Sequence, residues 1–213
     1  MSGVATLVLA SNNAKKLLEL RTLCEPLGLQ LQPQGALGVP EAEEPHATFV
    51  ENALAKARHA AAATGLPALA DDSGLCVDAL GGAPGVISAH FAPLVLEPGE
   101  REQQRRHQDA ANNRLLLQKL EGVSERRARF VSVLVALRSA QDPEPLITFG
   151  RWEGEILAQL RGEGGFGYDP LLWIPALGRT VAELDADIKN QHSHRATAAR
   201  AMRGLMREAW RLG

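Results

Sequence analysis

FVSVLVAL, at residues 130–137, is the strongest strand pattern in the chain. Its aliphatic and β-branched residues run almost without interruption, as in a strand that is buried within a sheet. A second strand, LITFGRWEGEIL, is expected at residues 146–157, after a turn that contains Asp142 and Pro143. Because the connection is short, the two segments predict an antiparallel pair.

Further strands and helices alternate on both sides of this pair. An apolar run at residues 4–10 predicts a buried strand, and residues 17–27 have helical spacing. A short strand is expected around Gln30, and Thr48 with Glu51 forms a capping-box pattern before a helix that ends near Thr64. A polar helix with leucines at its end is expected within residues 99–122, a strand at 171–174 and an amphipathic helix at 197–212. The pattern predicts an α/β fold, a mixed sheet with flanking helices, with two lobes around a cleft.

The composition argues for a protein of the reducing cytosol. The chain has 213 residues, 45% of them hydrophobic, which suits one domain over residues 1–213. Its net charge of −2 lacks the basic excess of a nucleic-acid surface, and no apolar stretch is long enough to span a bilayer. Cys24 and Cys76 form no disulfide or zinc pattern, and no basic region precedes the first apolar run. We therefore expect a cytoplasmic protein without a nucleic-acid or membrane partner.

The polar turn SNNAKK, where the first strand passes into a helix, is a candidate phosphate site. Open backbone N–H groups at a helix start favour bound phosphate, and a nearby lysine adds positive charge. The alternative is a surface helix start with two solvated lysines. The candidate contacts are Ser11, Asn12, Asn13, Ala14, Lys15 and Lys16.

Two adjacent carboxylates, Asp71 and Asp72, follow a short apolar strand at residues 68–70. They point in different directions, so one can face a cleft while the other holds the turn. Magnesium prefers one or two carboxylates with water and phosphate oxygens, and a single aspartate can orient an attacking water. The alternative is an ordinary Asx turn, in which Asp and Ser side chains of this segment bond to nearby backbone.

An acidic run that includes Glu43 and Glu44 precedes the capping-box helix. Acidic residues before a helix are usually solvated and favoured by the helix dipole. A metal role for this run requires that its loop meet Asp72 in space. Lys56, on the helix that follows, is on a polar face that could line the same site.

The segment GEGGFGYDP, at residues 162–170, contains the letters G-x-G-x-x-G. A dinucleotide-binding fingerprint must be followed by a helix, whereas Pro170 and an apolar strand follow here, so we exclude that interpretation. The glycines instead let the backbone approach a ligand closely, with Phe166 or Tyr168 available to stack on a base.

Three basic side chains, Lys189, His194 and Arg195, lie at or near the start of the last helix. Cations in a first turn oppose the helix dipole, so this segment is a candidate for holding an electron-rich group. A frayed and solvated helix start is the alternative. Taken together, the lysines, carboxylates, glycine loop and aromatic ring are what a magnesium–nucleotide site needs.

Six motifs in a fixed order resemble one family, the non-canonical purine nucleoside triphosphate pyrophosphatases, also called inosine triphosphatases or Ham1-like proteins. They are LASNNAKK, TFVENALAKA, ADDSGL, LGGAPGV, GGFGYDP and SHR, and they span nearly the whole chain. Each motif is weak by itself, but six in order are highly specific. The chain departs from the family pattern in two segments. Ser11 and Asn12 stand where the family usually has Thr and Gly. Ile87 and His90 stand where the family often has an aromatic residue and an arginine.

The resemblance implies Mg²⁺-dependent hydrolysis of dITP, ITP and XTP to a monophosphate and pyrophosphate, in a nucleotide cleft of a homodimer. It implies that Asp72 is the general base and a metal ligand, with either Glu43 or Glu44 as the second ligand. Lys16, Lys56 and Lys189 are candidates to stabilise charge on the departing oxygens. The other substrate contacts that it implies are Ser11–Lys16, Ser73, Phe166, Gly167, Tyr168, Asp169, Lys189, His194 and Arg195.

Two competing functions stay open at this point. A triphosphatase that attacks the γ-phosphorus would release orthophosphate instead of pyrophosphate. A regulator that binds nucleotide without turnover is a second possibility, although it need not keep a base such as Asp72 or a lysine such as Lys16.

Overall fold

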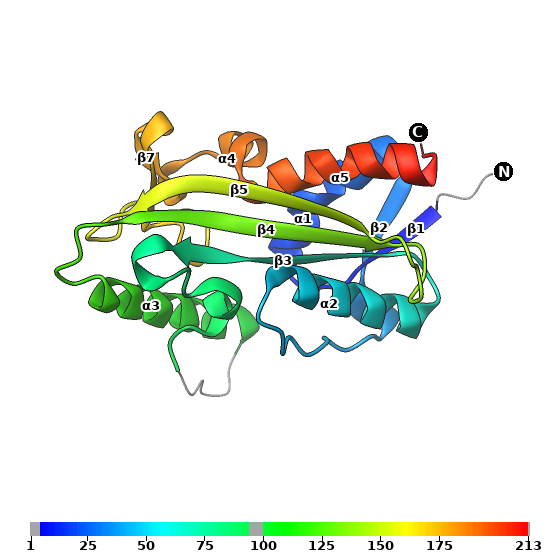
Figure 1. Cartoon of the computed structure of the whole chain (residues 1–213), viewed down its shortest axis with the longest axis horizontal. Coiled ribbons are helices and arrows are strands. Elements are labelled where there is room, and N and C mark those ends of the chain that lie inside the picture. Colours follow the sequence, from blue (N-terminus) through cyan, green and yellow to red (C-terminus); the bar gives the residue numbers. More distant parts are fainter. Residues whose placement is uncertain (1–4, 94–99, 213) are drawn as a thin grey trace. The chain divides into compact units, whose positions relative to one another are not determined.

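The computed structural model describes residues 5–93 and 100–212. Its strands form a seven-stranded sheet in the order β2-β1-β3-β4-β5-β6-β7 (Figure 1). The predicted mixed α/β class is confirmed, because β1 pairs in parallel with β2 and β3, whereas β6 pairs antiparallel with β5 and β7. The strands are β1 Ala5–Leu9, β2 Leu29–Pro33, β3 Ala68–Val77, β4 Arg127–Leu137, β5 Leu146–Ile156, β6 Leu172–Ile174 and β7 Arg179–Thr180.

Helices α1, α2, α3 and α5 lie near the segments that the sequence predicts as helical, whereas α4 was not predicted. Thr48 caps α2 by accepting the N–H of Glu51, as its capping-box pattern predicts. The two strongest strand patterns become β4 and β5, which are neighbours in the sheet. The α-helices are α1 Ala14–Cys24, α2 Phe49–Thr64, α3 Arg101–Lys119, α4 Ala186–His192 and α5 His194–Trp210, and the short 3₁₀ segments include η2 Gln34–Leu37 and η4 Gly85–His90.

The chain divides into two compact units. Unit 1 comprises Met1–Asp72, Ser132–Arg151 and His192–Gly213, and unit 2 comprises Ser73–Val131 and Trp152–Gln191. Three strands, β3, β4 and β5, therefore begin in one unit and end in the other. The aspartate pair closes the first segment of unit 1, whereas the glycine loop belongs wholly to unit 2.

Each unit has its own apolar core. In unit 1, α1 and α5 lie side by side on one face of the strands and α2 lies on the opposite face (Figure 1). The core on the α1 and α5 face includes Leu20 and Met202, both fully buried. In unit 2, Leu116 and Leu120 bring the end of α3 against Trp152 and the neighbouring strand residues.

The bounds of β3 and α5 differ from those that the sequence predicts. β3 runs through ten residues, so Asp71 and Asp72 lie inside a strand, and the Asx-turn alternative is wrong. α5 begins at His194, before the predicted residue 197, because Ser193 accepts the N–H of Ala196 at 3.1 Å and caps the helix. Val4 and Gly99, at the predicted ends of the first strand and the polar helix, lie outside the described residues.

None of the helices in the described part of the chain combines the length and the apolar character that crossing a bilayer requires.

Candidate active site

Consecutive residues of a strand face opposite sides of the sheet, so β3 sends Asp71 and Asp72 to different surroundings. Asp72 meets Lys56 of α2, whereas Asp71 meets Lys16 of α1 and Arg195 of α5. This division matches the helices of unit 1, because α2 lies on one face of the strands and α1 with α5 on the other (Figure 1). Each aspartate therefore has its own directly bound cations.

The Asp72 cluster consists of Asp72, Lys56 and Glu44. The Nζ atom of Lys56 donates to Oδ1 of Asp72 at 2.9 Å and to Oε1 of Glu44 at 3.0 Å. Burial lowers the pKa of Lys56, but attraction to the two carboxylates outweighs this effect and the pKa is raised. The lysine is thus a fixed positive charge beside both carboxylates.

The second oxygen of Asp72 has a different environment. Oδ2 is buried and accepts no hydrogen bond from any residue in the described ranges. Burial raises the pKa of Asp72, and this outweighs the attraction of Lys56 that lowers it. A buried carboxylate oxygen without a protein donor is suited to bind a metal ion or an attacking water.

A loop ahead of α2 brings Glu44 to this cluster. Asn52, 1% exposed, accepts the N–H of His46 at 3.0 Å and donates to its C=O at 3.2 Å. The two bonds fix the loop at His46, two residues after Glu44. Glu43 and Glu44 are both exposed, and Glu44 is the one that contacts Lys56.

The Asp72 cluster fits a magnesium ion. Asp72 offers an unused oxygen, and Glu44 shares the same lysine and is partly open to solvent. Among the residues that the structure describes, no group of three His, Cys, Asp or Glu side chains could hold a metal. Magnesium does not need such a cage, because it takes one or two carboxylates and completes its shell with water and phosphate oxygens.

The Asp71 cluster lies on the other face, with Asp71 and Arg195 buried and Lys16 partly exposed. Asp71 is 1% exposed, and its Oδ2 contacts Lys16 Nζ at 2.7 Å and Arg195 Nε at 3.3 Å. Its Oδ1 accepts the hydroxyl of Ser132 at 2.6 Å. Arg195 also binds Glu19 of α1. The frayed and solvated start predicted as an alternative for the last helix is therefore wrong.

The surroundings of Asp71 keep it ionised. Burial raises the pKa of this carboxyl, but Arg195 and Lys16 lower it much more strongly, so that it falls well below its usual range. Asp71 and Asp72 thus have pKa values that shift in opposite directions. This pattern separates a permanent anion, Asp71, from a carboxylate that can exchange a proton or a ligand, Asp72.

At the start of α1, side chains of the polar turn accept hydrogen bonds from the turn's own backbone N–H groups. Asn13 accepts the N–H groups of Lys15 and Lys16 at 3.0 and 3.4 Å, so these two are not open for phosphate as the sequence predicted. Ser11 accepts the N–H of Asn13 at 3.2 Å. Asn12 has no left-handed backbone, and its side chain instead accepts the N–H of Gly35 at 2.8 Å. The lysine side chains, rather than the helix start, remain the phosphate candidates.

In unit 2, the glycine loop (residues 162–170) presents Phe166 next to Lys189. Lys189 Nζ lies 4.6 Å from the centre of the Phe166 ring and donates to Oδ2 of Asp169 at 2.8 Å. The same oxygen of Asp169 accepts the N–H of Phe166 at 2.9 Å. The structure thus brings three predicted residues together, with the half-buried ring beside a cation.

Tyr168, the other aromatic residue of this loop, is not a stacking candidate. It is 4% exposed and packs in the core of unit 2, and its hydroxyl donates to the C=O of Ser88 at 2.9 Å. Burial raises the pKa of this hydroxyl. The side chain of Tyr168 therefore serves packing, and only Phe166 remains to stack on a base.

Two further predicted residues, Ser73 and His194, lie close to the sequence boundaries of the two units. Ser73 follows Asp72 in β3 and is half-buried. His194 is buried at the first position of α5, and a Cβ atom on Gly150 of β5 would lie 1.8 Å from its carbonyl oxygen. Only glycine at position 150 permits this close approach of β5 to the start of α5.

The Ham1 family model matches residues 7–205, which is most of the chain. The chain belongs to the Ham1 family.

Named relatives and solved structures agree with this assignment. A dITP/XTP pyrophosphatase of Leptothrix cholodnii is 69% identical, over 97% of this chain and 99% of its own length. One of Methylibium petroleiphilum is 68% identical, over 95% of this chain and 98% of its own. The structure of a HAM1 protein from Coxiella burnetii is similar with a TM-score of 0.86 at 44% identity, covering 96% of this chain and 99% of that one.

Sequence reasoning missed several residues of this Ham1 family protein that hold the predicted ones. Asp71 was expected only to hold a turn, and Glu19 and Ser132 were not assigned a contact. Glu19 had one available signal, because residues at positions i and i+3 of a helix share a face and it follows Lys16 by three. Nothing in the sequence linked Ser132 to Asp71, 61 residues earlier.

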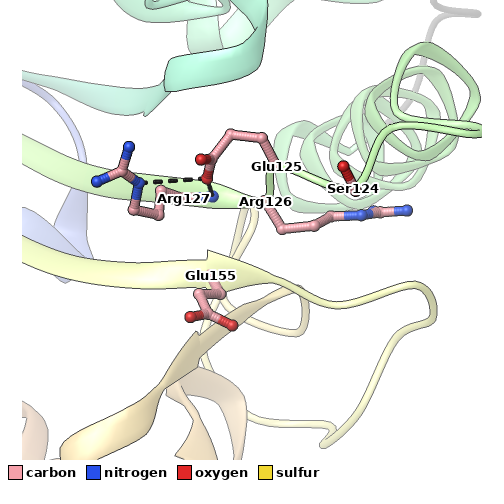
Figure 2. Close-up of a pocket in the computed structure, with 5 residues that line it drawn as sticks. All are labelled: Ser124, Glu125, Arg126, Arg127 and Glu155. Carbon is pink, nitrogen blue, oxygen red and sulfur yellow. Dashed lines mark hydrogen bonds and ion pairs between the residues drawn. The ribbon is translucent and has the colours of Figure 1, made fainter.

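A polar hollow of about 310 Å³ lies at the start of β4 and contains none of the predicted site residues (Figure 2). Its charges are matched locally, since Arg127 Nε lies 3.2 Å from Glu125 Oε1. Arg126 donates to the C=O of Leu120 at 3.1 Å. The hollow is lined by Ser124, Glu125, Arg126, Arg127 and Glu155.

Proposed function

We propose that this Ham1 family protein hydrolyses the non-canonical purine nucleoside triphosphates dITP, XTP and ITP to the monophosphate and pyrophosphate. Relatives that carry the name dITP/XTP pyrophosphatase align with nearly the whole chain at 57–69% identity, which supports this substrate class. The observation that carries the proposal is the pair of adjacent aspartates with opposite electrostatics. Asp72 keeps one buried oxygen without a protein donor, whereas Asp71 is fully ion-paired.

In the proposed reaction, Asp72 orients a water molecule and takes its proton as the water oxygen bonds to the α-phosphorus. The bond between this phosphorus and the bridging oxygen breaks, and pyrophosphate leaves with the bonding electrons. A magnesium ion held by Asp72 and Glu44 would supply positive charge to the triphosphate oxygens. Lys56 stays protonated beside both carboxylates, and Lys16 offsets further negative charge.

As the resemblance implies, we propose Phe166, His194 and Arg195 as the residues that recognise the base. Phe166 would stack on any purine, so the choice among purines must come from hydrogen bonds to the base edge. His194 and Arg195 are the proposed donors to the 6-oxygen of hypoxanthine or xanthine. Two donor groups of Arg195 are bound to Asp71 and Glu19, so we assign the direct contact to His194 first and a supporting role to Arg195.

We also propose the assembly and setting that the family resemblance implies. The protein would act as a homodimer in the cytoplasm on a small-molecule substrate, without a nucleic-acid or membrane partner. The net charge of −2 supports the absence of a nucleic-acid surface.

Product analysis tests the proposal directly. The purified protein is incubated with dITP, XTP, ATP and GTP, with Mg²⁺ or with EDTA, and the phosphorus products are separated. We expect pyrophosphate from dITP and XTP, far less from ATP and GTP, and none in EDTA. Orthophosphate as the first product would favour attack at the γ-phosphorus, and nucleotide binding without turnover would favour a regulator.

A further inference from the structure

Phe166 lies in a stretch of backbone that has little stiffness of its own. Gly165 and Gly167 flank it, and both adopt the left-handed conformation with φ of +76° and +62°. Glycine loses more conformational freedom on ordering than other residues, so a ring between two glycines is costly to hold in one orientation. The orientation of Phe166 must therefore be fixed by contacts from elsewhere in unit 2.

Helix α3 supplies such contacts at both polar groups of Gly167. Oδ2 of Asp109 accepts the N–H of Gly167 at 2.8 Å, and Nδ2 of Asn113 donates to its C=O at 2.9 Å. Asp109 and Asn113 are four residues apart, so they project from the same face of α3. The peptide groups on either side of the Gly167 Cα are thus tied to one rigid element.

The burial of Asn113 indicates that its hydrogen bond to Gly167 is the reason for an asparagine at this position. The side chain is 5% exposed, and its Oδ1 is buried with no hydrogen-bond partner among the described residues. A buried carbonyl without a partner is unfavourable, and an apolar residue at this position would avoid it. The bond from Nδ2 to Gly167 is what an asparagine contributes here and an apolar residue cannot.

The other end of the loop is held independently. Asp169 accepts the N–H of Phe166, and Lys189 contacts both Asp169 and the Phe166 ring. Asp169 and Lys189 therefore position the residue from its N–H side, while Asp109 and Asn113 fix the backbone that follows it.

We infer that Asp109 and Asn113 are positioning residues that hold the glycine loop so that Phe166 presents its ring to a purine base. The inference rests on the proposed function, because it needs a nucleotide substrate. Preorganisation of this kind lowers the cost of ordering the loop when the base binds. Loss of either contact should raise KM for dITP and leave kcat nearly unchanged, since neither residue touches the reacting phosphate groups.

Single variants give the first test, with KM and kcat measured for dITP and the thermal midpoint measured for every variant. Asn113→Ala should raise KM about fivefold and Asp109→Ala about tenfold, as expected for a neutral and a charge-assisted hydrogen bond. Asp109→Asn keeps an acceptor oxygen for Gly167 and should restore most of the wild-type KM. Arg114→Ala, at an exposed position of the same helix, is the control and should match the wild type.

A double-mutant cycle with Phe166→Ala decides whether the two residues act through the ring. If they do, Asn113→Ala and Asp109→Ala should leave KM unchanged in the Phe166→Ala background. KM effects that multiply in that background would overturn the inference, as would a wild-type KM in Asp109→Ala. Should Asn113→Ala fail to fold, the Asp109→Ala and Asp109→Asn pair carries the same test.

The same assay separates this inference from the proposed function. A wild-type protein that releases no pyrophosphate from dITP would overturn both. An active wild-type enzyme with multiplying effects in the cycle would overturn only the positioning role of α3.

Discussion

In unit 1 the candidate functional groups are charged side chains that neutralise one another, whereas in unit 2 the candidate base contact is a ring held through its backbone. The Asp71 and Asp72 clusters join elements of unit 1 through ion pairs, several of them buried. The glycine loop of unit 2 is held by Asp109, Asn113 and Asp169 through hydrogen bonds to main-chain groups. Changes in unit 1 should therefore affect chemistry or folding strongly, and changes that loosen the loop of unit 2 should affect affinity.

A second contrast lies within unit 1, between two adjacent aspartates. Lys56 binds one oxygen of Asp72 and no described residue binds the other, while Lys16, Arg195 and Ser132 together contact both oxygens of Asp71. The difference arises because consecutive strand residues face opposite sides of the sheet. One residue is thereby available for chemistry and its neighbour for structure. The following predictions test that division.

The largest effect is expected from Asp72→Asn. The change removes the charge and the basicity while keeping the volume, and loss of a general base costs about 10²- to 10⁴-fold in rate. Pyrophosphate release from dITP measures it, and circular dichroism with a thermal melt shows whether the fold is intact. A folded variant that kept more than about a tenth of the wild-type rate would show that Asp72 is not the base.

Asp71→Asn should reduce stability instead. It leaves the buried Arg195 and the partly buried Lys16 without their shared anion, and breaking a buried ion pair from one side costs about 3–5 kcal/mol. Urea unfolding of the two variants side by side provides the measurement. If Asp72→Asn destabilised the protein as much as Asp71→Asn, the division between the two aspartates would be lost.

The stability difference should also depend on pH. The pKa of Asp71 is held well below its usual range, so its stabilisation is present above the ordinary value of about 3.9 and is lost as pH falls through the lowered native value. The difference in the free energy of unfolding between wild type and Asp71→Asn should therefore become smaller in acid. A gap that stayed constant down to the acid transition would argue against an ionised Asp71.

The pH dependence of activity should report Asp72. Burial raises the pKa of this carboxyl despite the attraction of Lys56, and a base works only when it is ionised. We expect kcat/KM to fall about tenfold per pH unit on the acid side, below an apparent pKa higher than the ordinary value of about 3.9. The stability contribution of Asp72 has the opposite sign to that of Asp71, since a raised native pKa favours the folded state below the ordinary value.

The smallest effect is expected from Asn52→Ala. Its two bonds to His46 hold the loop that carries Glu44, so their loss should raise the Mg²⁺ concentration for half-maximal activity about fivefold. The maximal rate at saturating Mg²⁺ should change little. Glu43→Gln is the matched control, because Glu43 lies in the same loop and Glu44 is the residue that contacts Lys56. An equal shift in both variants would favour Glu43 as the second ligand.

The sequence by itself determined the class of fold and the order of its elements. Hydrophobic periodicity located β4, β5 and α5, and the Thr48 cap fixed the start of α2, because these signals depend on residues close together in the chain. It also supplied six ordered motifs that resemble one family, and the family assignment is confirmed by the match over residues 7–205. The nucleotide cleft and the dimer stay predictions.

Local signals failed where a residue's surroundings come from distant segments. The sequence placed Asp71 and Asp72 in a turn, but pairing within the sheet extends β3 through both. It offered Tyr168 as a stacking ring, although core packing buries that side chain. It left the N–H groups of Lys15 and Lys16 open, whereas Asn13 caps them.

Only the tertiary structure decided what each of the predicted residues contacts. Arg195 meets Asp71 across 124 positions of sequence, and Asn113 meets Gly167 across 54. Burial, which makes these contacts strong and shifts the pKa values of the two aspartates in opposite directions, is a property of the packed chain. Residue types alone therefore indicated the chemistry that is available, and packing leaves a buried oxygen of Asp72 without a described donor while both oxygens of Asp71 are bound.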